Sequence, residues 1–190
     1  MERALWLLTI LGVLGAFDTL YYHEWKARLP ARGPATHPEL KLHAARDFIY
    51  ALLFCSLPWF TFQGLWAAVI CVVLVAEILI TLADFVVEGK VRRPLGGVYP
   101  GERTTHAIMG IVYGAMLANL APVLLDWLRA PTALSRSPLA EGLALVLRWA
   151  LVLMGAGVFI SGLRDTLAVL GLRYADWPWR GALKHSTPTE

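Results

Sequence analysis

Charged residues are scarce in this chain. Asp, Glu, Lys and Arg make up 16% of the 190 residues, whereas about 25% is usual in soluble domains. Hydrophobic residues reach 57%, and the mean hydropathy is +0.57. A short chain this apolar cannot bury its hydrophobic side chains in one aqueous core, which predicts an integral membrane protein. The net charge of +3 is too small to indicate a nucleic-acid partner.

Cysteine is also nearly absent. The two cysteines, Cys55 and Cys71, both lie inside apolar runs, and neither belongs to a Cys-x-x-Cys or Cys/His pattern. This spacing excludes a disulfide framework or a zinc site built on thiolates. We therefore expect two buried free thiols.

Several motifs that define membrane enzymes and transporters are missing. The five histidines form none of the His-x-x-His boxes typical of membrane fatty-acid desaturases and hydroxylases. The Glu-x-x-His pattern of soluble dinuclear metal bundles does not occur. We find no phosphate-binding loop and no Ser/His/Asp arrangement. The chain has no internal repeat, which argues against an alternating-access transporter.

What the sequence does contain is five apolar segments, each close to the roughly 20 residues that a helix needs to cross a bilayer. They predict an all-α fold with five transmembrane helices in a compact bundle, as a multi-pass protein of the cell membrane. Residues 1–180 then form a single domain and 181–190 a flexible tail. Pro58 predicts a kink in the second segment. The predicted spans are 4–22, 46–63, 65–87, 105–127 and 142–163.

The distribution of Lys and Arg predicts the orientation of these spans. Basic residues crowd the first and third connections and follow the fifth span, whereas the opposite side has three. We therefore expect the N-terminus outside and the C-terminus in the cytoplasm. The crowded side has Lys26, Arg28, Arg32, Lys41, Arg46, Lys90, Arg92, Arg93, Arg103, Arg173, Arg180 and Lys184, and the other side Arg3, Arg129 and Arg136.

Every predicted span also contributes ionisable residues near its cytoplasmic end. Helical spacing places several of them on shared faces, such as His43 with Asp47 in a His-x-x-x-Asp pattern and Glu102 with His106 in a Glu-x-x-x-His pattern. His23 lies about 140° from Asp18 on a regular helix, so it joins them only if the helix end unwinds. The candidate metal ligands are Asp18, His23, His43, Asp47, Glu77, Asp84, Glu102 and His106.

Glu77 is the most informative of these residues because it lies deepest in an apolar span. An isolated carboxylate there costs at least about 2.5–3.5 kcal/mol, so it must be protonated, paired or bound to a cation. Tyr22, Tyr50 and Tyr113 are candidates for hydrogen bonds to such carboxylates. We take Glu77, Tyr113 and Arg46 as candidate catalytic residues.

Carboxylates and imidazoles without thiolates suit iron, manganese or zinc. The prediction is a membrane enzyme with one or two divalent metal ions at its cytoplasmic side, acting as an oxidoreductase or hydrolase on a lipid or isoprenoid-like substrate. Two alternatives stay open. One is a structural polar collar in a scaffold or accessory subunit, and the other is a proton or ion path. A haem held by His43 and His106 is disfavoured because neither lies deep enough. Gly110 and Gly114 form a GxxxG motif that permits a homo-oligomer.

Overall fold

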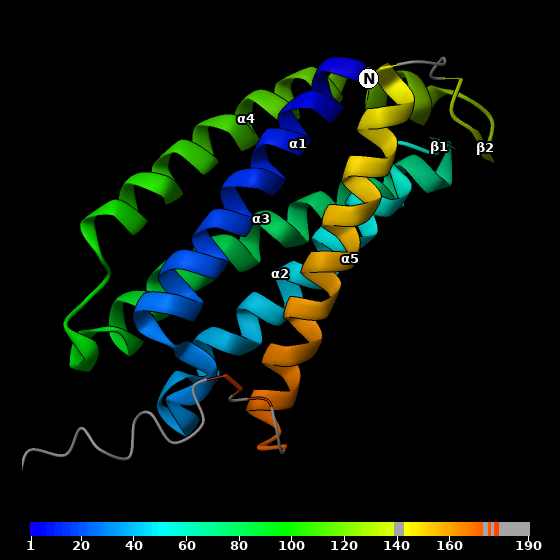
Figure 1. Ribbon diagram of the computed structural model, residues 1–190. Coiled ribbons are helices and arrows are strands. Elements are labelled where there is room, and N and C mark those ends of the chain that lie inside the picture. Colours follow the sequence, from blue (N-terminus) through cyan, green and yellow to red (C-terminus); the bar gives the residue numbers. More distant parts are fainter. Residues whose placement is uncertain (139–142, 173–174, 176, 179–190) are drawn as a thin grey trace, which may run out of the picture.

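The computed structural model describes residues 1–138, 143–172, 175, 177 and 178. The described chain is mostly helical, with one short pair of strands (Figure 1). Its elements, in order, are α1 (Glu2–Phe17), the π-helix η1 (Asp18–Ala27), the 3₁₀ turns η2 (Leu29–Ala31) and η3 (Gly33–Thr36), α2 (His37–Ser56), β1 (Phe60–Gln63), α3 (Leu65–Val91), the 3₁₀ turn η4 (Arg93–Leu95), α4 (Pro100–Arg129), β2 (Ala133–Arg136) and α5 (Leu143–Val169).

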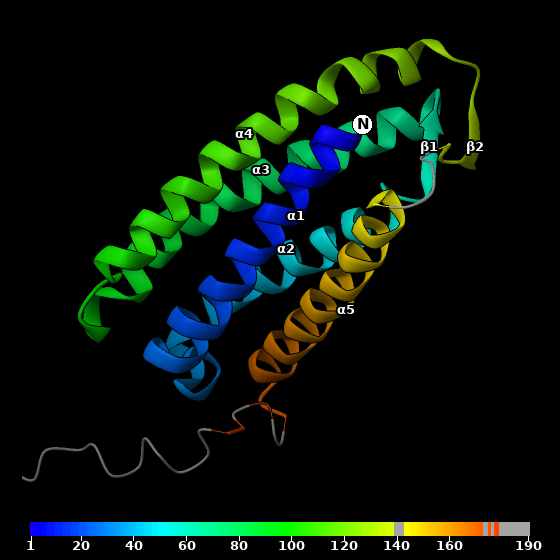
Figure 2. The same cartoon turned by 45° about the horizontal axis from the view of Figure 1, so that its top comes forward.

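The five α-helices pack as a closed ring. Following the ring, α1 contacts α4, α4 contacts α3, α3 contacts α2, α2 contacts α5, and α5 returns to α1. In both ribbon views α1 lies between α4 and α5, with α3 and α2 behind it (Figures 1 and 2). This arrangement brings the end of α1, the start of α2 and the start of α4 to one end of the bundle.

The two strands close the opposite end. β1 pairs antiparallel with β2, with Phe60 opposite Arg136 and Gln63 opposite Ala133. Gly64 follows β1 with φ of +57°, and an added Cβ would lie 2.6 Å from the Cα of Thr132. Only glycine fits this position, because it both tolerates the positive φ and permits the close approach of the second strand.

The interior of the bundle is divided into two halves. Around the strand-capped end, the core is apolar and contains side chains such as Leu5, Leu53, Leu74, Leu120 and Leu151. Toward the other end, the buried side chains are ionisable, which soluble cores rarely allow unless the groups are paired. These buried residues are Asp18, His23, Glu39, His43, Glu77, Asp84, Glu88, Arg92, Glu102 and Asp165.

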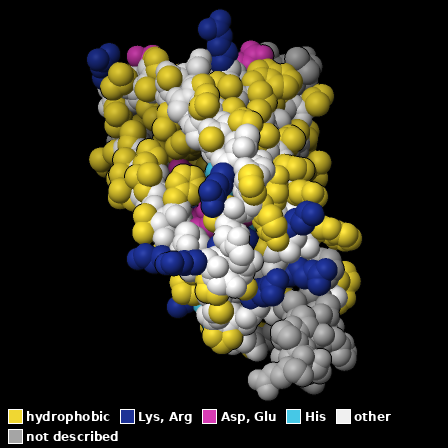
Figure 3. All heavy atoms as spheres, turned by 90° about the vertical axis from the view of Figure 1, so that its left-hand side faces the viewer, with side chains coloured by type: hydrophobic (Ala, Val, Ile, Leu, Met, Phe, Trp, Pro, Cys, Tyr) yellow, Lys and Arg dark blue, Asp and Glu magenta, His cyan; other side chains and the backbone are white. Residues whose placement is uncertain are grey.

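The outer surface is apolar along the helices. Leu65, Ile111 and Leu153 are each more than 70% exposed, and hydrophobic side chains cover much of the face in Figure 3. Four helical stretches in the described chain are long and apolar enough to span a membrane: Glu2–Ala31, Leu65–Val91, Pro100–Arg129 and Leu145–Val169. Such extensive exposed apolar surface is typical of contact with lipid.

The helix α2 is not among these four candidates, so the predicted count of five spans and the sides of the termini stay predictions. The predicted span 46–63 is wrong in its last part, because α2 ends at Ser56 and Phe60–Gln63 form β1. Pro58 has no N–H to continue the helix, so the chain turns there and does not kink. The predicted tail 181–190 lies outside the described residues.

Candidate metal centre

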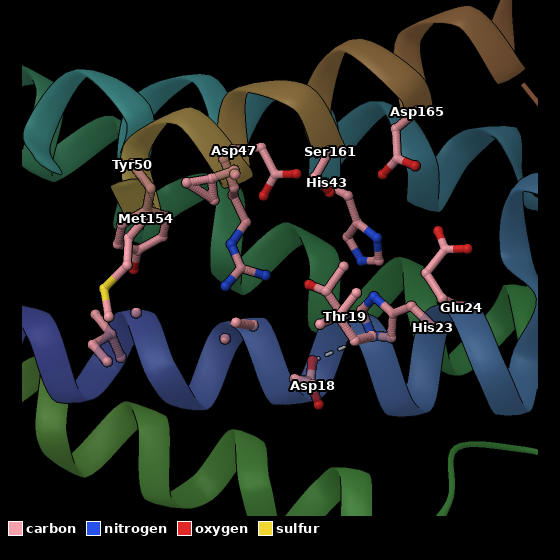
Figure 4. Close-up of a pocket in the computed structure, with 18 of the residues that line it drawn as sticks. Asp18, Thr19, His23, Glu24, His43, Asp47, Tyr50, Met154, Ser161 and Asp165 are labelled. Carbon is pink, nitrogen blue, oxygen red and sulfur yellow. Dashed lines mark ion pairs between the residues drawn. The ribbon is translucent and has the colours of Figure 1, made fainter. Parts of the chain in front are cut away.

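A π-helix at the end of α1 turns two predicted ligands toward the same side. On a regular α-helix Asp18 and His23 would diverge, but η1 forms hydrogen bonds of the i→i+5 type, as from the Arg28 N–H to the His23 carbonyl. This wider turn brings residues five apart close together. The His23 Nε2 lies 3.3 Å from the Asp18 Oδ2 (Figure 4). The end of α1 is therefore unwound, as the sequence prediction required for His23 to join the other residues.

Four side chains from η1, α3 and α4 form what we call the His/Glu cluster: His23, Glu88, Glu102 and His106. Each offers one ligand atom, and these atoms all lie within 4.8 Å of one another. The His23 Nε2 is 3.2 Å from the Glu102 Oε1, and the His106 Nδ1 is 3.7 Å from the Glu88 Oε2. Asp18 joins from the side, with its Oδ2 3.0 Å from the His106 Nε2. Imidazole and carboxylate ligands at this spacing could hold a divalent metal ion.

A second group lies beside the cluster, between α2 and α3. We call it the α2–α3 group: Glu39, His43, Arg46 and Asp84. The Asp84 Oδ2 accepts a 2.9 Å hydrogen bond from the Arg46 guanidinium and lies 3.3 Å from the His43 Nε2. The His43 Nε2 lies 3.9 Å from the Glu39 Oε1.

Two contacts join the cluster to the α2–α3 group. The rings of His23 and His43 stack with centroids 4.6 Å apart and an interplanar angle of 7°. The guanidinium of Arg92 donates hydrogen bonds to Glu39 at 2.8 Å and to Glu102 at 3.1 Å. Arg92, Glu39 and Glu102 are all 1% exposed or less. The two groups therefore form one continuous buried network.

The sequence prediction missed three members of this network. Glu39 shares with His43 the Glu-x-x-x-His spacing of Glu102 and His106, so the repeated spacing is the signal that could have found it. Glu88 was not named as a candidate ligand, and Arg92 was assigned to the basic third connection. The structure buries both, because α3 continues to Val91 and carries them into the bundle.

Two predicted ligands, Glu77 and Asp47, belong neither to the His/Glu cluster nor to the α2–α3 group. Glu77 is seven residues before Asp84, about 10 Å along the helix axis, and accepts hydrogen bonds from Tyr50 at 2.9 Å and from Thr81 at 2.8 Å. The hydroxyl of Tyr113 also interacts electrostatically with Glu77. The Arg46 Nε lies 3.9 Å from the Glu77 Oε1. The three candidate catalytic residues thus meet one another, but they do not meet the cluster. Asp47 instead faces a cavity against α5 (Figure 4).

Several buried carboxylate oxygens have no hydrogen-bond donor among the described residues. They are the Asp18 Oδ1, Glu77 Oε2, Asp84 Oδ1 and Glu88 Oε1. Buried acceptors normally have a hydrogen-bond donor. A buried carboxylate oxygen without one is still able to bind a proton or a cation. Two ligands about 2.1 Å from one ion are at most about 4.2 Å apart. The ligand atoms of the cluster, which lie up to 4.8 Å apart, would therefore move closer together around an ion.

A cavity of about 440 Å³ adjoins this network between α1, η1, α2 and α5. Asp18, His23 and His43 line one part of it, whereas Leu11, Phe54 and Met154 line the far part (Figure 4). The network therefore has an apolar approach of the size typical of ligand sites.

Comparison of the chain with protein families, curated proteins and solved structures finds no match. The functional assignment accordingly depends on the chemistry of the site itself.

Proposed function

We propose that the protein is a membrane-embedded, metal-dependent enzyme that acts on a lipid or isoprenoid-like substrate. The observation that carries this proposal is the His/Glu cluster, in which four ligand atoms lie within 4.8 Å inside a bundle with apolar outer faces. Two imidazoles and two carboxylates suit iron, manganese or zinc, and helical bundles build such sites from facing helices.

The α2–α3 group supports a second, adjacent ion. Glu39, His43 and Asp84 supply the same ligand types, and the stacked imidazoles of His23 and His43 link the two groups. Two arginines, Arg46 and Arg92, neutralise carboxylate charge in that group, whereas in the His/Glu cluster only Arg92 does so, through Glu102. The His/Glu cluster is therefore the position that we assign to the first ion. When bound, an ion there would supply Lewis-acid or redox chemistry beside the cavity.

The cavity supports a lipid-like substrate. Its apolar part runs beside Leu11, Phe54 and Met154, and its polar part reaches Asp18 and His23. A molecule with an apolar chain would therefore place its polar end next to the cluster. The positive residues of the first and third connections favour the cytoplasmic leaflet as the source of this molecule.

A structural collar is the second candidate, and Arg92 is the observation that favours it. Its buried guanidinium bridges Glu39 and Glu102, as a cation does in a purely structural network. A buried ion pair of this kind can define a unique packing without contributing to catalysis. The two proposals differ in whether the remaining carboxylates bind metal.

Elemental analysis of the protein, purified in detergent without chelators, tests the proposal. We expect at least one divalent metal ion per chain in the His/Glu cluster, and a second where the α2–α3 group is also occupied. His106→Ala and Glu88→Gln should lose the ion of the His/Glu cluster. His37→Ala and Asp126→Asn are the matched controls, since both side chains lie outside the network, and they should retain the metal. Wild-type protein that stays metal-free after addition of iron, manganese or zinc would overturn the proposal. If His106→Ala then lowers only the unfolding temperature, the collar is correct.

A further inference from the structure

The cavity between α1, η1, α2 and α5 has two chemically different ends. On α5, Met154 lies in its apolar end and Asp165 in its polar end. Eleven residues separate them, about 16 Å along the helix. Figure 4 shows Met154 and Tyr50 at one end, and His43, Glu24 and Asp165 at the other. A cavity of this length and polarity fits a single-chain amphiphile better than a compact polar molecule.

The cavity opens on the apolar outer face of the bundle. Leu20 and Leu153 line it, yet they are 67% and 72% exposed, so they form its rim. Gly157 also lines it, and a Cβ built there meets no atom within 4 Å. If this face contacts lipid, an amphiphile can enter sideways from the bilayer.

The polar end contains two carboxylates without a cationic partner. Asp165 is 7% exposed and forms no hydrogen bond or ion pair with the described residues. Asp47 is half-buried and forms no ion pair in the described chain, although the Ser161 hydroxyl donates a hydrogen bond to it (Figure 4). The neighbouring cations already have partners, since Arg164 pairs with Glu24, and Arg46 and His43 with Asp84. A buried carboxylate without a partner is costly, and a bound cation would offset that cost.

We propose that this cavity binds a single-chain amphiphile with a protonated amine head. The ammonium group lies between Asp47 and Asp165 and donates hydrogen bonds to their carboxylates, while the alkyl chain lies along Leu11, Phe54 and Met154. An anionic head would meet the same two carboxylates and be repelled. Binding itself requires no metal, but identification of this amphiphile as the substrate rests on the proposed function.

Binding of three probes that differ only in their head group tests the inference. The protein is reconstituted in lipid nanodiscs with a chelator and titrated with dodecylamine, dodecanol or dodecanoate, and binding is followed by native mass spectrometry and thermal stability. Charge-assisted hydrogen bonds contribute about 1.5–3 kcal/mol, so dodecylamine should bind at least roughly tenfold more tightly than dodecanol. Asp165→Asn should remove this preference for the amine without weakening the binding of dodecanol.

Gly157→Leu tests the location. A leucine there adds a side chain to the lining of the cavity, and its Cβ meets no atom within 4 Å, so binding of the amine and the alcohol should both be lost. Gly110→Leu is the control, because Gly110 has the same open surroundings on α4 outside the cavity. Equal affinity for the three head groups, or unchanged amine binding in Asp165→Asn, would overturn the assignment of the head group. Unchanged binding in Gly157→Leu would overturn the location.

The metal content of the same variants separates this inference from the proposed function. Asp165 lies outside the His/Glu cluster, so Asp165→Asn should keep the wild-type metal content while it loses amine selectivity. Amine binding by wild-type protein that never takes up metal would support the cavity assignment and overturn the enzyme. Metal binding without amine binding would support the metal site and overturn the cavity assignment.

Discussion

Arg92 is the residue on which the buried network depends most directly. Its guanidinium lies between Glu39 and Glu102, and all three side chains are almost fully buried. Removing one partner of such a network leaves uncompensated charge in the interior, which costs about 3–5 kcal/mol. We therefore expect Arg92→Gln to lower the unfolding free energy by about that amount, measured by thermal or denaturant unfolding in detergent.

A second substitution shows whether the loss comes from charge. Arg92→Gln leaves the carboxylates of Glu39 and Glu102 without their cation. Arg92→Gln/Glu39→Gln removes one of these two charges, so the double variant should be more stable than Arg92→Gln alone. Arg129→Gln is the control, since Arg129 is exposed at the end of α4 and should change stability by less than about 0.5 kcal/mol. An Arg92→Gln protein as stable as this control would contradict the role that we assign to Arg92.

The sequence could not reveal Arg92 because a basic residue after an apolar span has a simpler explanation in membrane topology. The same holds for Glu88, which a helix end explains equally well. His23 was predicted conditionally, and only the π-helix decides its position. By contrast, the sequence could place Glu102 and His106 together, because their four-residue spacing puts them on one helix face, and both belong to the His/Glu cluster.

At the scale of elements, long apolar runs predicted the approximate positions of all five α-helices. The end of α2 was misplaced because the apolar run continues through Leu57, Trp59, Phe60 and Phe62, and hydropathy alone does not separate a short strand from a helix. Pairing with β2 decides that Phe60–Gln63 is a strand, and its partner lies about 70 residues later in the chain. No local pattern contains this information.

The contact between η1 and the start of α4 holds the His/Glu cluster together. A Cβ built on Gly101 would overlap the Tyr22 hydroxyl and lie 3.2 Å from its Cζ. His23 and Glu102, the next residues in each element, belong to the cluster. We expect Gly101→Ala to push η1 away, to lower the unfolding free energy by about 1–3 kcal/mol and to reduce the copurified metal. Elemental analysis and thermal unfolding measure the two effects.

Tyr22→Phe supplies the compensating change for this variant. It removes the hydroxyl that the new methyl group would meet, so Gly101→Ala/Tyr22→Phe should recover most of the lost stability. Gly110→Ala is the control on the same helix, where nothing lies within 4 Å of the added Cβ. Because alanine favours helices over glycine, an increase in stability of Gly101→Ala would show that the contact between η1 and α4 is looser than the structure indicates.

At the scale of the whole molecule, the polar half of the interior requires each helix to reach the same end of the bundle. α2 supplies Glu39, His43 and Arg46 to the network from its first half, and these polar side chains lower the hydropathy of the helix. They face the network and not the outer surface, so they do not prevent crossing. With 20 residues, α2 is about 30 Å long, which matches the hydrocarbon thickness.

We therefore predict that α2 crosses the membrane and that the two termini lie on opposite sides. We expect a reporter active only outside the cytoplasm to work when fused before Met1 and to fail when fused after Glu190. A reporter that requires the cytoplasm should give the reverse. A fusion within 130–138, in the α4–α5 connection, should behave like the N-terminal one, because β2 lies at the same end of the bundle as the start of α1 (Figure 1). If both termini report the same side, α2 does not cross, and the network lies in a re-entrant pocket of a four-span protein.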